Sequence, residues 1–125
     1  MDSFPDIERV HQILDEIAET LPLEFFNRLN EGVVLLPQHK YHPRSRSDRR
    51  LYIMGEYHKS FTGSHIRIYY GSFKRVFRNI SEEELRKHLE HTLLHEFTHH
   101  LETLAGERGL IIKDQEALRK YLQEW

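Results

Sequence analysis

The sequence predicts an α+β fold in which helices near both ends of the chain enclose a small sheet. Residues 5–20 and 81–105 each show apolar side chains at three- and four-residue steps, the pattern of a helix with one buried face. Between them, residues 33–38, 51–58 and 65–73 are rich in branched and aromatic side chains, which is typical of strands. A chain of 125 residues has the length of one domain, so we expect residues 1–125 to form a single unit.

The predicted helices carry recognisable end signals. Pro22 and Gly32 favour a short helix between the first helix and the first strand. Ser81 has the spacing to Glu84 of a capping box, and Gly106 can adopt the left-handed conformation that ends a helix. A final helix is predicted to begin after Asp114 and to continue to the end of the chain.

Composition excludes several kinds of protein. Hydrophobic residues make up 38% and charged residues 30%, the balance of a globular domain, and the net charge of -2 gives no general attraction to nucleic acid or anionic membranes. The chain has no cysteine, so a metal would have to be bound by His, Asp or Glu. We find no signal peptide and no apolar run long enough to span a bilayer, and therefore expect a cytoplasmic protein without a membrane partner.

The predicted long helix contains the stretch His95-Glu96-Phe97-Thr98-His99. On a helix, His95, His99 and Glu102 lie within about 60° of one another and nearly opposite the leucine-rich face. Two imidazoles one turn apart can direct nitrogen atoms at a common metal ion, with zinc as the expected cofactor. Glu96 is turned away from that tripod and is placed to take a proton from a metal-bound water. The pattern thus predicts a zinc-dependent peptidase with Glu96 as its catalytic residue.

The third protein ligand is less well determined by the sequence. Glu102 follows His99 by about one turn, and helical side chains lean toward the N-terminus, so we favour Glu102. Glu107, directly after Gly106, and Asp114, in the following turn, are the alternatives.

The stretch "HTLLHEFTHHLETLAGERG" resembles the small bacterial zincin-like metallopeptidases, which are compact single-domain proteins. The resemblance implies a minimal zincin-like fold, His95 and His99 as zinc ligands and Glu96 as general base. Zincins as a class pair substrate with an edge strand beside the motif helix, and residues 65–73 resemble that strand. Tyr69 or Tyr70 could then donate to the oxyanion. The segment "LETLAGERGLIIKD" is longer than its counterpart in the family, so the family's third ligand does not map to one position.

A second notable segment is the run "YHPRSRSDRR" at residues 41–50, which we interpret as an exposed, mobile, basic loop. It supports an alternative function, a nucleic-acid-binding protein that uses this loop, and a further alternative is a zincin-fold module that binds metal without catalysis. We favour the peptidase, acting as a monomer on peptide or protein substrates, over a nucleic-acid partner.

Overall fold

A computed structural model gives the fold, and it describes residues 4–108. The elements, in chain order, are α1 (Ile7–Thr20), the short 3₁₀ helix η1 (Leu23–Phe26), β1 (Val33–Leu36), β2 (Gly55–Ser60), β3 (Gly63–Tyr69), α2 (Tyr70–Val76) and α3 (Glu82–Arg108). The predicted α+β class is confirmed. The predicted final helix, with Asp114, lies outside the described residues.

The three strands form a mixed sheet in the order β1-β3-β2. β1 runs parallel to β3, with Val33 opposite Ile66, and β2 runs antiparallel to β3, with Gly55 opposite Ile68. The central strand is therefore β3, and the expectation that residues 65–73 form the edge strand beside the motif is wrong. β2 occupies that edge, because it joins β3 through the tight connection at residues 60–63 and leaves the other side of β3 for β1.

The third predicted strand also ends earlier than expected. The last residue of β1, Leu36, lies opposite Tyr69 of β3. After Tyr69, β3 therefore has no β1 residue to pair with, and the chain continues as α2. The α2 backbone passes very close to residues 38 and 39, where the Gly71 N–H donates to the Gln38 carbonyl (3.2 Å). A Cβ on Gly71 would lie only 2.6 Å from the His39 nitrogen, so this close approach requires glycine.

The long helix begins as predicted, with the Glu84 N–H bonded to the Ser81 hydroxyl (3.1 Å). Its predicted end is wrong, because α3 continues through Gly106 to Arg108. A glycine inside a helix costs only about 1 kcal/mol, so Gly106 does not by itself end α3.

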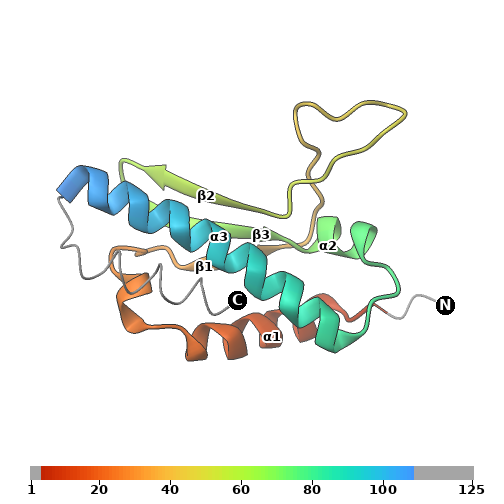
Figure 1. The fold of residues 1–125 in the computed structure, drawn as a ribbon, viewed down its shortest axis with the longest axis horizontal. Helices are drawn as coiled ribbons and strands as arrows, with labels where there is room; N and C mark the ends of the chain where they lie inside the picture. The colour runs from red at the N-terminus through yellow and green to blue at the C-terminus, as the bar shows by residue number, and fades with distance from the viewer. Residues whose placement is uncertain (1–3, 109–125) are drawn as a thin grey trace.

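The core lies between one face of the sheet and the two long helices, which gives two layers (Figure 1). α3 lies across β2 and β3 and also contacts α1. The apolar face predicted for α3 is the buried one, and its fully buried members are Leu85, Leu89, Leu93 and Phe97. None of the described helices is long and apolar enough to cross a membrane.

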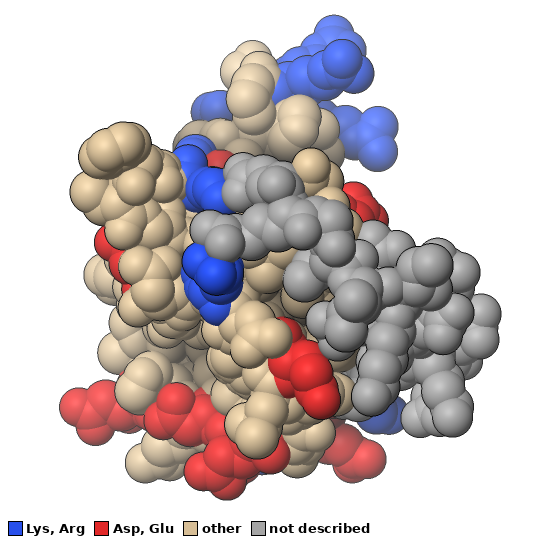
Figure 2. All heavy atoms as spheres, turned by 90° about the vertical axis from the view of Figure 1, so that its left-hand side faces the viewer, with Lys and Arg blue, Asp and Glu red and all other residues tan. Residues whose placement is uncertain are grey.

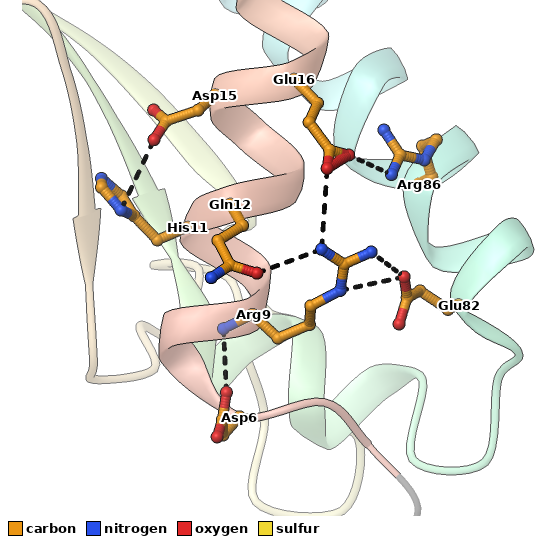
Figure 3. Close-up of polar contacts among 8 residues, drawn as sticks. All are labelled: Asp6, Arg9, His11, Gln12, Asp15, Glu16, Glu82 and Arg86. Atoms are coloured by element: carbon orange, nitrogen blue, oxygen red, sulfur yellow. Dashed lines mark hydrogen bonds and ion pairs between the residues drawn. The ribbon is translucent and has the colours of Figure 1, made fainter.

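Polar contacts fix α1 against the first turns of α3 (Figure 3). Arg9 of α1 binds the carboxylate of Glu82, and Arg86 of α3 donates to Glu16 (2.6 Å). The Asp6 side chain caps α1 by accepting from the Arg9 N–H (2.8 Å). These contacts sit on the exposed side of the two helices and leave the opposite end of α3, which carries the motif, to be positioned by the sheet.

Candidate metal centre

The two motif histidines converge. His95 and His99 are both exposed on α3, and their Nε2 atoms lie 3.2 Å apart with the rings nearly perpendicular, at 87°. This placement is the consequence of a spacing of four residues on a regular helix, where side chains one turn apart stand above one another. The pair therefore presents two nitrogen atoms to one point in front of the helix.

Glu96 lies beside this pair but points toward the sheet. It is only 7% exposed, and its carboxylate accepts a hydrogen bond from the backbone of Tyr57 on β2. Burial raises the pKa of Glu96, and the nearby His95 and His99 oppose that rise in part. The carboxylate thus lies between the helix and the edge strand.

β2 and α3 together line an open cleft of about 480 Å³ in front of the motif. Its lining residues are Ile53, Gly55, Glu56, Tyr57, His95, Glu96, His99 and Thr103. The strand and the helix approach each other closely at Gly55, where a Cβ would lie 2.9 Å from Cγ2 of Thr92. A side chain at position 55 would force the strand away from the helix, so glycine sets the width of the cleft.

The outer edge of β2, which pairs with no other strand among the described residues, faces this cleft. The Tyr69 N–H donates to the Met54 carbonyl (2.9 Å), which makes 54 and 69 a hydrogen-bonded pair. Because such pairs alternate along an antiparallel ladder, the backbone groups of Gly55, Tyr57 and Lys59 point away from β3. Tyr57 uses its N–H for Glu96, and the other outward groups face the position that an added strand would take.

Glu56, on the wall of the cleft, is a firmly ionised carboxylate. It accepts hydrogen bonds from the Tyr69 hydroxyl (2.5 Å), the Lys40 ammonium (2.9 Å) and His58 (3.3 Å). Burial alone would raise the pKa of Glu56, but these three donors outweigh it and lower the pKa to about 2. Tyr69 is therefore engaged with Glu56, and Tyr70 donates to the Pro5 carbonyl (2.6 Å). Both hydroxyls have partners other than the motif, which argues against either as an oxyanion donor.

His100, next to the second motif histidine, has a different role. Its side chain is fully buried, with Nε2 donating to the Asn27 carbonyl (2.7 Å) and Nδ1 paired with the Tyr57 hydroxyl (2.9 Å). Burial lowers the pKa of His100, so the ring is neutral and Nδ1 accepts from the tyrosine. His100 thus fastens the motif turn of α3 to β2 and to the chain after η1.

Of the three candidate third ligands, the structure describes only the side chain of Glu102. Glu102 is exposed on α3, makes no ion pair within the described part of the chain and is not among the residues that line the cleft. Among the described side chains, those of residues 4–106, no three His, Asp or Glu side chains gather closely enough to hold a metal ion. The side chain of Glu107 and all of Asp114 lie outside the described part.

Comparison with known proteins assigns the chain to a family. The family model described as zincin-like metallopeptidase matches residues 49–116, which is more than half of the chain and includes β2, β3 and the motif helix. The chain belongs to the zincin-like metallopeptidase family. Among solved structures, a conserved hypothetical protein from Thermus thermophilus is similar at a TM-score of 0.65 and 30% sequence identity, over 81% of this chain and 98% of that chain. No protein of curated function matches the chain in sequence.

The zincin-like family implies zinc binding in general, and the geometry of the histidine pair fits that ion. Two nitrogen ligands at 2.0–2.1 Å from a tetrahedral zinc lie about 3.3 Å from each other. The observed separation of 3.2 Å between the Nε2 atoms of His95 and His99 is close to this value. The pair could hold zinc without rearrangement of α3.

Three features of the site do not follow from the sequence pattern. These are the Tyr57 backbone contact to Glu96, the buried anchor at His100 and the carboxylate network of Glu56. One available signal was Gly55 within a strand, since such a glycine often marks a close approach of another element.

Proposed function

We propose that this zincin-like protein is a zinc-dependent peptidase, with His95 and His99 as zinc ligands and Glu96 as general base. The observation that carries the proposal is the convergence of the two Nε2 atoms at 3.2 Å beside a buried, hydrogen-bonded Glu96. When bound, zinc would lower the pKa of a water molecule and polarise the scissile carbonyl.

Glu96 would accept a proton within the cleft and return it to the leaving amine. Its backbone hydrogen bond to Tyr57 keeps the carboxylate oriented, and burial favours uptake of the proton by raising its pKa. The substrate would add an extended strand to β2, where the outward backbone groups of Gly55 provide main-chain hydrogen bonds with little sequence preference.

As third ligand we propose Glu102, one turn beyond His99 on the same helix and without an ion pair in the described part of the chain. A change of side-chain rotamer would direct it toward the histidine pair. Glu107 and Asp114 are the competing ligands. Zinc content of Glu102→Gln, Glu107→Gln and Asp114→Asn, measured side by side, distinguishes them, because only the ligand variant should lose zinc affinity strongly.

The first experiment is elemental analysis of zinc in protein purified without added metal. We expect about one zinc per chain in the wild type and in Glu96→Gln, and none in His95→Ala. His91→Ala is the matched control, because His91 is an exposed histidine one turn before His95 and should leave zinc bound. Equal zinc content in the wild type and His95→Ala would refute the metal site.

Peptide hydrolysis then separates a peptidase from a metal-binding module without catalysis. A mixture of unstructured peptides incubated with zinc-loaded protein should be cleaved by the wild type and by His91→Ala, and at least a hundredfold more slowly by Glu96→Gln. Zinc binding without any cleavage would favour the non-catalytic module.

A further inference from the structure

Residues 39–53, which we name the arm, form a hairpin-like projection, and the arginines expected to be exposed lie on it. Tyr41 pairs with Tyr52, and Arg46 pairs with Arg49 nearer the tip. The His42 N–H donates to the Leu51 carbonyl and the Ile53 N–H to the Lys40 carbonyl, both at 2.8 Å. Figure 1 shows the arm standing out from the sheet at the end where β2 begins.

The arm concentrates positive charge in a chain whose net charge is negative. Arg44, Arg46, Arg49 and Arg50 are all exposed, and the one carboxylate of the arm, Asp48, lies 3.8 Å from Arg46. Figure 2 shows Lys and Arg gathered at the top of the molecule, where the arm stands, and Asp and Glu gathered at the bottom. Within residues 4–108, Arg44 and Arg49 make no ion pair, so their guanidinium groups can receive carboxylates from another molecule.

The arm is continuous with the wall of the cleft. Ile53, at its base, and Gly55, at the start of β2, both line the cleft, and Lys40 of the arm is bound to Glu56 of the cleft wall. A peptide paired with the outer edge of β2 that leaves the cleft at Gly55 therefore meets the arm. Arg49 and Arg50 are three to four residues from Ile53, or roughly 10–13 Å along extended chain.

We propose that the arm selects substrates that carry a run of Asp or Glu side chains on the side of the scissile bond where the peptide leaves the cleft at Gly55. This inference rests on the proposed peptidase function. The arm's aromatic rings are less suited to stacking nucleic-acid bases, because they already pack on one another. The ring centroid of Tyr41 lies 4.9 Å from that of His39 and 5.2 Å from that of Tyr52. The guanidinium carbon of Arg50 lies over the Tyr41 ring, 4.9 Å from its centroid. The arm's guanidinium groups, not its rings, are offered to a ligand.

The test uses peptide libraries with six randomised central residues. Each carries a flanking block of four residues, either Glu-Glu-Asp-Glu or its neutral counterpart Gln-Gln-Asn-Gln, on the N-terminal or the C-terminal side. Cleavage by zinc-loaded wild type is followed by mass spectrometry, and binding to zinc-loaded Glu96→Gln is followed by fluorescence anisotropy. The arm variant combines Arg44→Gln, Arg49→Gln and Arg50→Gln, and it is made both in the wild type and in Glu96→Gln. The control removes the same number of charges with Lys74→Gln, Arg78→Gln and Lys87→Gln, whose positions are exposed and do not line the cleft.

We expect the acidic block, on one side only, to improve both binding and cleavage about fivefold at low salt, the size expected of two or three exposed ion pairs. The arm variant should lose this preference and cleave the neutral library at the wild-type rate, while the control keeps the preference. Equal use of acidic and neutral libraries, or a preference that survives in the arm variant, would overturn the proposal.

Two further outcomes separate this proposal from others. Arm-dependent binding of a ten-nucleotide oligouridine, without preference for acidic peptides, would assign the arm to nucleic acid and overturn the proposal. Arm-dependent binding of acidic peptides by Glu96→Gln, with no cleavage of any library by the wild type, would support the arm's role as a peptide-binding element and contradict the peptidase function.

Discussion

Replacing His100 by alanine should destabilise the protein strongly, whereas the same change at the adjacent His99 should not. His100 is fully buried and its two ring nitrogens are bound to the Asn27 carbonyl (2.7 Å) and the Tyr57 hydroxyl (2.9 Å). The imidazole of His99 is exposed, and its ring contacts that of His95.

The magnitude follows from the groups left behind. His100→Ala leaves a buried carbonyl and a buried hydroxyl without partners, at about 1–3 kcal/mol each, and opens a cavity of imidazole size. Partial relaxation and entry of water reduce the sum, so we expect a loss of about 3 kcal/mol in the free energy of unfolding. For a chain of this length that corresponds to a fall in Tm of about 12 °C. An exposed substitution such as His99→Ala should change stability by less than about 0.5 kcal/mol.

The assay is urea unfolding followed by circular dichroism in the presence of a chelator, so that zinc does not contribute. Zinc content is measured separately on the folded proteins, where His99→Ala should lose the metal and His100→Ala should retain it. Tyr57→Phe removes one of the two hydrogen bonds and should cost about 1 kcal/mol. A free energy of unfolding for His100→Ala within about 1 kcal/mol of the wild type would contradict the structural role of His100, as would an equal loss in His99→Ala.

Three further changes test other parts of the structure. Glu56→Gln should lower the free energy of unfolding at neutral pH by about 2 kcal/mol. The pKa of Glu56 is about 2 in the folded state, below its usual 4.5, so its contribution is present above pH 4.5 and is lost as pH falls toward 2. Between those pH values, the free energy of unfolding should therefore depend less on pH in the variant than in the wild type. Gly55→Ala should leave zinc bound but slow peptide cleavage at least tenfold, because the added methyl group pushes β2 away from α3. Adding Thr92→Ser to the same chain removes the methyl group that would clash and should restore part of the rate. Zinc at a hundred times its Kd should raise the free energy of unfolding by about 2.7 kcal/mol in the wild type and not at all in His95→Ala, as measured by thermal unfolding.

The parts of the fold that could be predicted from sequence are those determined locally. The apolar faces of α1 and α3 repeat with the helical period, and Ser81 caps its helix as its spacing to Glu84 suggests. For the same reason the convergence of His95 and His99 could be predicted, because four residues on a helix place two side chains one above the other.

The parts that could not be predicted depend on contacts between distant segments. Alternation in residues 65–73 shows that one face is buried, but it does not say which neighbours a strand has, and β3 lies in the centre of the sheet with β2 at the edge. Likewise the arginines of residues 41–50 are typical of a loop. The pairing of Tyr41 with Tyr52, which gives the arm its hairpin shape, depends on where β1 and β2 place its two ends.

The sequence of the motif, His-Glu-x-x-His-His, places functional and structural side chains in adjacent positions, and Tyr57 shows how the two are connected. Its backbone N–H holds Glu96 and its hydroxyl holds His100, so one residue of the edge strand fixes both the candidate base and the structural histidine. Successive residues on a helix are rotated by about 100°, which lets His99 face the cleft while His100 enters the core. The orientation of the metal-binding pair relative to a strand-paired substrate is therefore set by buried contacts that do not themselves touch the metal or the substrate.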